Sequence, residues 1–264
     1  NKLYENNIYP IARIIAFKDN TIKNVYPDFV LKNKDGSMYE SSEPGGKSTT
    51  WLNPYNQDVW KYILTIAKEA AKVGFKEIQF DYIRFHEGTD KERIDFGLEA
   101  ENKDKIQIIS EFTKYAVEEL HKQGVYVSVD VFGAIITSKI DAEIVGQDYT
   151  QLSRTVDYIC PMIYPSHYAE GSFGVEHPDL QPYEIVLSAM EASRDRLREI
   201  KNDEHCAIVR PWLQDFTAKW IPVYQIYGPN EIRKQIQGVY DAGLYEWILW
   251  SASNAYTEGG LLAE

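Results

Sequence analysis

The sequence has 264 residues, a formal net charge of −12 and an isoelectric point of about 5.0. This length fits one large α/β domain, and a hydrophobic content of 44% is enough to build its core. The acidic balance argues against a DNA- or RNA-binding protein, because a phosphate backbone requires a basic surface. It argues equally against adsorption to anionic membranes. No apolar run reaches the length of a transmembrane helix, and no signal peptide is visible.

Amphipathic helices and short apolar strands alternate along the chain. Each unit consists of a helix, a glycine that ends it and an apolar strand, as in residues 57–73, Gly74 and the strand that follows. In chain order we predict strands at 8–17, 77–85, 125–132, 156–164, 206–213 and 246–252. The predicted helices cover 57–73, 105–122 and 182–200, and a last helix starts near Asn230 as its N-cap.

This alternation predicts parallel strands joined by right-handed crossovers. A (β/α) barrel of the TIM type and an open doubly wound sheet both fit, but no GxGxxG follows a strand, which disfavours nucleotide binding. We therefore expect one barrel domain over residues 1–264. Six strands are visible where a full barrel needs eight, so either short strands escape recognition or this chain lacks the first strand and helix. Residues 32–50 and 165–181 read as long loops.

The two cysteines, Cys160 and Cys206, lie in apolar strand-like segments with no framework spacing. We expect both to be buried and reduced rather than joined in a disulfide. Neither cysteine nor histidine spacing indicates a metal site, so we expect no metal and no cofactor.

Two aspartates interrupt the apolar strands. Asp81 and Asp130 each follow a helix-ending glycine by six or seven residues, so they should lie at similar depths on consecutive strands. An aspartate in a buried strand is costly unless it is paired or functional. Two carboxylates across a cleft are the minimum equipment for glycoside hydrolysis, one as nucleophile or base and one as acid. Alternatively, Asp81 is a structural partner of Arg84 or Arg13.

Further polar and aromatic residues fall at the ends of the predicted strands, where barrel enzymes build their sites. Asp215 is a third candidate acid or base, with a plain surface role as the alternative. The arginines can hold a carboxylate or form structural ion pairs, and the aromatic residues can stack on a sugar or line the core. The candidate substrate-binding residues are Arg13, Arg84, Tyr164, His167, Arg210, Trp212, Gln214 and Trp250.

Several segments together resemble a known family. They are IYPIARIIAFKD, GFKEIQFDYIRF, VSVDVFG, GQDY, DYICPMIYPSHY, VRPWLQDF and YEWILWSASNAY, in family order between about Ile8 and Tyr256. This pattern is similar to a bacterial family of glycoside hydrolase domains, once catalogued as a domain of unknown function and related to the barrels of α-amylases and α-galactosidases. Within these segments the motifs FDYIRF and PMIYPSHY are long and specific.

The resemblance implies a (β/α) barrel with glycosidase chemistry on an extracellular or cell-envelope polysaccharide, in a secreted or envelope-associated protein. It makes Asp81 the leading catalytic residue and Asp130 the next. Family members begin with another strand that has an acidic end, and the present chain starts after it. The partner implied is a carbohydrate, and we expect a monomer. The alternative is a barrel that binds carbohydrate without catalysis, and a metal-dependent deacetylase is disfavoured by the missing ligand spacing.

Overall fold

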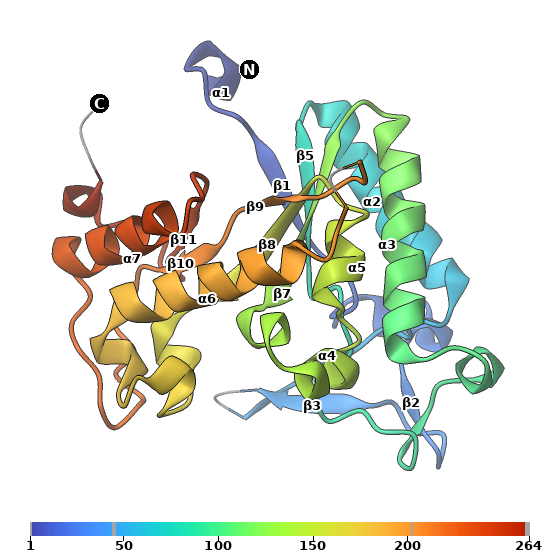
Figure 1. The fold of residues 1–264 in the computed structure, drawn as a ribbon. Coiled ribbons are helices and arrows are strands. Elements are labelled where there is room, and N and C mark those ends of the chain that lie inside the picture. Colours follow the sequence, from blue (N-terminus) through green and yellow to red (C-terminus); the bar gives the residue numbers. More distant parts are fainter. Residues whose placement is uncertain (1, 44–45, 202, 262–264) are drawn as a thin grey trace.

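The computed structural model describes residues 2–43, 46–201 and 203–261. Its centre is a single sheet in which every pair of neighbouring strands is parallel (Figure 1). The strands follow the order β1 (Ile11–Ile15), β5 (Glu77–Asp81), β7 (Tyr126–Phe132), β8 (Tyr158–Ile163), β10 (Trp212–Gln214) and β11 (Ile248–Trp250), with β9 (Ile208–Val209) beside β8.

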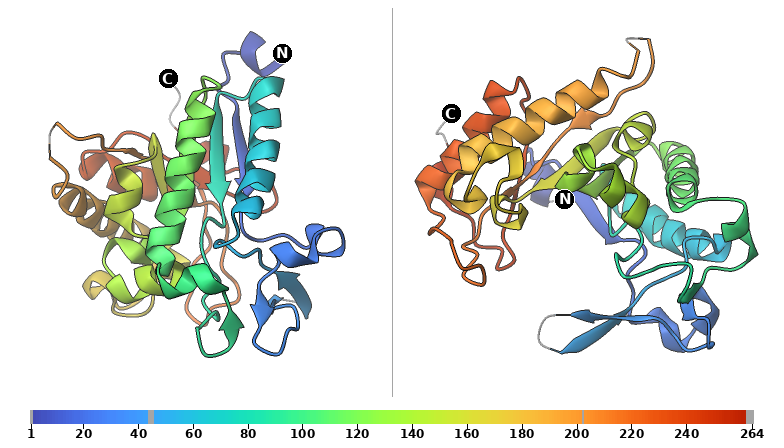
Figure 2. Two further views of the ribbon diagram at one scale, coloured as in Figure 1. Left: turned by 90° about the vertical axis from the view of Figure 1, so that its right-hand side faces the viewer. Right: turned by 60° about the horizontal axis from the view of Figure 1, so that its bottom comes forward.

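Helices flank the curled sheet between successive strands, as the two further views in Figure 2 show. This is the connection that parallel strands require. The helices are α1 (Lys2–Glu5), α2 (Gln57–Val73), α3 (Lys105–His121), α4 (Lys139–Val145), α5 (Tyr149–Ser153), α6 (Pro182–Leu197) and α7 (Pro229–Asp241). The sheet is a half-barrel. Among the described residues it does not close, and β1 and β11 form its edges. The prediction of a (β/α) barrel short of strands is thereby confirmed.

The helix ends follow local chemistry. The Asn56 side chain accepts a hydrogen bond from the Asp58 amide, and Gly74 ends α2 with a φ of 116°. The prediction that Asn230 caps the last helix was wrong by two residues. Gly228 is the N-cap and Pro229 takes the first helical position, where the fixed φ of proline favours a helix and its missing amide costs nothing.

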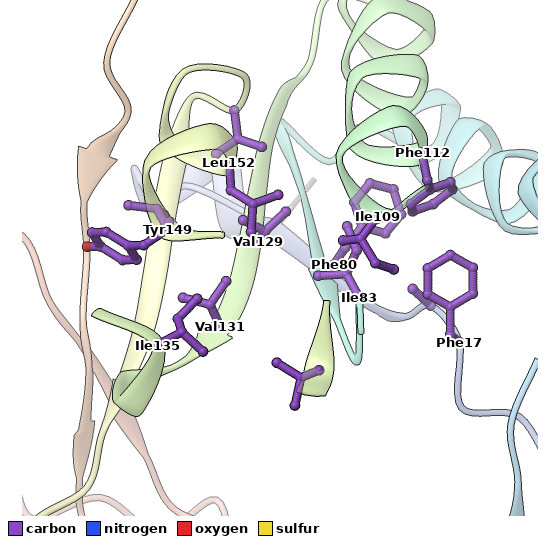
Figure 3. Packing of buried hydrophobic residues seen from close by; sticks show 14 of the residues in the cluster. Phe17, Phe80, Ile83, Ile109, Phe112, Val129, Val131, Ile135, Tyr149 and Leu152 are labelled. Atoms are coloured by element: carbon purple, nitrogen blue, oxygen red, sulfur yellow. The ribbon is translucent and has the colours of Figure 1, made fainter. Parts of the chain in front are cut away.

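The main core lies between the outer face of the sheet and its helices (Figure 3). Phe80 on β5 meets Phe112 on α3 at 5.9 Å between ring centroids, and Phe17 meets the same ring at 4.9 Å. Ile109 on α3 and Val129 on β7 are also fully buried. Alternate residues of the strands thus anchor the helices, which leaves the other residues to face the barrel interior.

Several strands are shorter than predicted, for identifiable reasons. The segment 77–85 stops as a strand at Asp81, because Tyr82 adopts a φ of 51°. The segment 206–213 splits into β9 and β10 at Arg210 and Pro211. Proline has no amide hydrogen to donate to a neighbouring strand, which accounts for the break.

The long loops carry structure that was not predicted. Residues 32–50 contain β2 (Lys32–Asn33) and a hairpin of β3 (Glu40–Glu43) and β4 (Lys47–Thr50), and β2 pairs with β6 (Ile94–Asp95). The hairpin projects beyond the carboxyl ends of the parallel strands (Figures 1 and 2). The loop 165–181 holds three 3₁₀ turns.

The cysteine prediction was half right. Both thiols are free, and Cys160 is completely buried inside the half-barrel. Cys206 is exposed, because it lies in the loop before β9 rather than in the predicted strand.

Candidate active site

Asp81 is the last residue of β5 and stands at the carboxyl end of the sheet. Its side chain is 5% exposed. The Tyr82 amide donates a 2.8 Å hydrogen bond to Asp81 Oδ1. Tyr82 itself has a φ of 51°, in the left-handed region that side chains rarely adopt. Such backbone strain gathers at functional sites, where the surrounding structure holds it in place.

Asp130 lies on the neighbouring strand β7, and its side chain is fully buried. Trp212 Nε1 on β10 donates a 2.7 Å hydrogen bond to Asp130 Oδ1, and Arg13 Nε on β1 donates one of 2.8 Å to Oδ2. Strands that are not sheet neighbours therefore meet at this carboxylate, because the sheet is curled.

Arg13 joins the two aspartates. Its Nη2 lies 2.7 Å from Asp81 Oδ2, while its Nε holds Asp130. The guanidinium carbon is 5.1 Å from the ring centroid of Trp212 and 4.9 Å from that of Trp250. Asp81 and Asp130, which we call the acid pair, thus share one cation enclosed by two indole rings. Arg13 was predicted as a substrate-binding residue, and the structure gives it a bridging position within the pair.

The acid pair holds protons unusually tightly. Burial, and next to it repulsion from Asp81, raise the pKa of Asp130 to about 7 against the opposing effect of Arg13. Burial also raises the pKa of Asp81, while Arg13 lowers it. Two carboxylates beside one guanidinium group are most stable with a single shared proton. The charges of the two carboxylates, the proton and the guanidinium group then sum to zero. At neutral pH the pair can therefore offer one ionised and one protonated carboxyl group.

One wall of the site consists of aromatic rings at the ends of β8 and β10. Tyr164 packs in the same cluster as Trp212, and burial together with Asp130 raises the pKa of its hydroxyl group. Tyr164 lies 5.3 Å from His167 and 5.7 Å from Phe216 between ring centroids. Tyr164, His167, Trp212 and Trp250, all predicted to bind substrate, are thereby brought to one region.

A cavity of about 300 Å³ opens next to this wall. It is mainly apolar, and the hydroxyl group of Tyr168 is buried there without a hydrogen-bond partner among the described residues. Sites of this kind, with apolar walls and few polar groups, are typical of small-ligand pockets. The cavity is lined by Phe132, Gly133, Ala134, Met162, Tyr164, His167 and Tyr168.

Arg84 lies near Asp81 and is surrounded by aromatic rings. Its guanidinium carbon lies 4.2 Å from the ring centroid of Phe132, 5.1 Å from that of Trp51 and 5.3 Å from that of Tyr82. Arg84 Nη1 donates to the Phe85 carbonyl group. Arg84 thus remains near Asp81 as predicted, but it is only 8% exposed. Its burial among rings, which lowers the pKa of the guanidinium group, limits its access to a ligand.

Three residues that were predicted for the site make contacts within the fold instead. Arg210 points to the amino-terminal end of the sheet, where its Nη1 lies 2.9 Å from Glu77 Oε1 and its Nε lies 2.7 Å from Glu246 Oε2. Gln214 is completely buried and accepts hydrogen bonds from Ser166. Asp215 is also buried, rather than on the surface. Its two oxygens accept hydrogen bonds of 2.6 and 2.8 Å from Thr257. These contacts fasten strand ends and loops together.

Sequence reasoning did not single out Tyr82, Trp51, Phe132, Phe216 or Trp220. Tyr82 and Phe132 sit directly at strand ends, and Phe216 follows one, so the rule that barrel sites form there could have found them. Trp51 comes from the unpredicted hairpin region, and no pattern in the sequence places it beside β5.

No group of three or more histidine, cysteine, aspartate or glutamate side chains is arranged to hold a metal ion within the described residues. Nor does this part of the chain contain a helix with the length and apolar character needed to span a membrane.

Comparison with known proteins identifies the family. Residues 1–256 match the family described as "Putative glycosyl hydrolase domain". The chain belongs to this family. Among proteins with curated descriptions, none matches.

Solved structures agree on the fold. The glycoside hydrolase domain of PgaB (BpsB) from Bordetella bronchiseptica aligns with a TM-score of 0.63 at 15% identity, covering 94% of this chain and 72% of that one. The spore cortex-lytic enzyme SleL from Bacillus megaterium QM B1551 aligns with a TM-score of 0.57 at 12% identity, covering 98% and 59%.

A hypothetical protein from Ruminiclostridium thermocellum is 41% identical over 48% of this chain, with a TM-score of 0.41, and the match spans 61% of that protein. The chain therefore covers less than two thirds of that relative.

Proposed function

We propose that this domain is a glycoside hydrolase that cleaves a polysaccharide by a two-carboxylate mechanism centred on the acid pair. The observation that carries the proposal is the bridge from Arg13 to both Asp81 and Asp130 at the carboxyl end of the sheet. Family membership supports hydrolysis of a glycosidic bond, and the position of the pair matches where barrel enzymes place their chemistry.

In this mechanism Asp81 is the ionised member and attacks the anomeric carbon, and Asp130 supplies the proton to the leaving oxygen. A bond forms from the Asp81 carboxylate to the anomeric carbon while the glycosidic bond breaks. Water then gives a proton to Asp130 and attacks that carbon, which breaks the bond to Asp81 and releases the sugar. A carboxyl group with a pKa near 7 suits the acid role at neutral pH. Arg13 stabilises the negative charge that remains on the pair after the proton has left.

A second candidate function is carbohydrate binding without turnover. The complete burial of the Asp130 side chain favours it, because both of its oxygens already accept hydrogen bonds from Arg13 and Trp212. In that case the acid pair only holds the barrel wall in place, and the aromatic residues bind the sugar.

The test is release of reducing ends from a panel of bacterial exopolysaccharides and cell-wall fragments. Asp81→Asn should reduce turnover at least about a thousandfold while the circular dichroism spectrum stays unchanged. Asp58→Asn, an exposed aspartate on α2, is the matched control and should keep full activity. Equal turnover by Asp81→Asn and the intact protein would exclude Asp81 as nucleophile. Binding with no turnover by any form would favour the second function.

We place the substrate among extracellular or cell-envelope polysaccharides, with the protein secreted or attached to the envelope. Similarity to a spore cortex-lytic enzyme supports this placement at the level of the fold. Cell-wall fragments therefore come first in the panel.

A further inference from the structure

A row of aromatic rings leads from the acid pair to the surface. Tyr164, beside Asp130, meets Phe216 edge-on at 5.7 Å between ring centroids. Phe216 in turn stacks on Trp220 at 5.8 Å with only 20° between the ring planes. His167 lies against both Phe216 and Trp220, at 6.1 and 6.4 Å. The row therefore continues the site wall outward along the loop after β10.

Trp220, at the end of this row, is unusually exposed to solvent for a tryptophan. It is 67% exposed, although tryptophan side chains are highly buried on average. One face of its indole covers Phe216, and no ring packs in parallel on the other face among the described residues. The same loop exposes Val223, Tyr224 and Ile226. Exposed apolar groups that gather at the rim of a site indicate a ligand surface.

We infer that Phe216 and Trp220 form a platform for sugar units beyond the point of cleavage, so that the ligand is a chain of neutral sugars rather than a single terminal one. The inference rests on the proposed function, because it extends the same site. The apolar faces of sugar rings stack on flat aromatic side chains, and Trp220 offers one such face to solvent. The row is continuous with the acid pair, so a chain bound there would reach the carboxylates.

Other occupants fit less well. A formal net charge of −12 opposes attachment of this loop to an anionic membrane. A docked protein would cover the end of the row and block the approach to the acid pair. A sugar chain is the ligand that uses both the exposed ring and the carboxylates.

The experiment compares the intact protein with Trp220→Ala in affinity gel electrophoresis. The gels contain glycol chitin, dextran, galactan or sonicated cell-wall glycan. Tyr245→Ala is the control, because Tyr245 is 81% exposed and lies before β11, at the opposite end of the sheet. Trp220→Ala should weaken retardation by the bound polymer about 3- to 10-fold, the range that aromatic stacking supports. Tyr245→Ala should leave it unchanged.

Hydrolysis of oligomers prepared from the same polymer provides the second readout. Trp220→Ala should raise KM for long oligomers and leave kcat, and the hydrolysis of the shortest cleaved oligomer, unchanged. An equal effect on short and long oligomers would overturn the inference, as would the absence of retardation by every polymer. The inference would also be overturned if the intact protein bound to lipid vesicles or to itself and Trp220→Ala abolished that association. Retardation that depends on Trp220 without any hydrolysis would refute the proposed enzyme and leave the platform standing.

Discussion

Replacing Asp130 by Asn should change how the stability of the protein depends on pH. In the folded protein the pKa of Asp130 is raised to about 7, mainly by burial, whereas an unfolded chain gives an aspartate about 3.9. Between pH 4 and pH 7 the folded state therefore holds one proton more than the unfolded state. Stability must fall as pH rises through this window.

The size of the effect follows from the width of the window. A difference of about three pH units at about 1.4 kcal/mol each gives about 4 kcal/mol of stability lost between pH 4 and pH 7. Asparagine has nearly the same shape as aspartate and does not titrate. It can still accept one hydrogen bond from Trp212 or Arg13, so Asp130→Asn should fold and should lack this loss.

The unfolding free energies of the intact protein and of Asp130→Asn are measured by urea unfolding at every half pH unit from pH 4 to pH 8. The expected result is that the difference in unfolding free energy, variant minus intact protein, rises by about 4 kcal/mol across the window. Parallel curves would refute the raised pKa and with it the protonated acid of the mechanism. If Asp130 is the proton donor, the variant should also lose about a hundredfold or more in turnover.

Three further outcomes are expected. Arg210→Met leaves the buried Glu77 carboxylate unpaired, so we expect a loss of about 3–5 kcal/mol in unfolding free energy and unchanged turnover per folded molecule. Lys105→Met removes hydrogen bonds of 2.6 Å to the Thr89 carbonyl group and 2.9 Å to that of Ile144, which should cost about 1–2 kcal/mol in the same urea assay. One guanidinium group holds both members of the acid pair, an arrangement that favours the close carboxyl spacing of about 5 Å typical of retaining enzymes. NMR of the first product should then show retained anomeric configuration.

Exposed ion pairs provide the controls for the two stability predictions. Arg198→Met and Lys72→Met remove pairs whose side chains are all more than 60% exposed. Each should change the unfolding free energy by less than about 0.5 kcal/mol. If these variants lost as much unfolding free energy as Arg210→Met, buried ion pairs would stabilise the protein no more than exposed ones. Inversion at the anomeric carbon would likewise contradict the close spacing.

The acid pair was accessible to sequence reasoning because it breaks a pattern. Asp81 and Asp130 interrupt mainly apolar segments, six or seven residues after a glycine that follows a helix, and the structure places both on Arg13. The parallel arrangement of the strands followed in the same way, from helices alternating with apolar segments. Such signals repeat along the chain and depend only on neighbours in the sequence.

What failed depended on side-chain direction or on partners far away in the chain. Arg210 was assigned to the site because it comes late in its predicted segment, but Pro211 breaks the strand there and the arginine reaches back to Glu77 at the other end of the sheet. Asp215 reads as a loop residue, and only the fold brings Thr257 to both of its oxygens. Phe216 and Trp220 lie in a loop without periodicity, where no pattern tells a ligand surface from an ordinary turn.

The fluorescence of Trp212 should report on the protonation of the acid pair. Its indole N–H group bonds to one member of the acid pair, and its ring face borders the guanidinium group that holds both. An indole in such a field shifts its emission when a nearby charge appears or disappears. Protonation of the pair should therefore change the fluorescence of Trp212, a residue that is only 6% exposed, without a label attached to the chain.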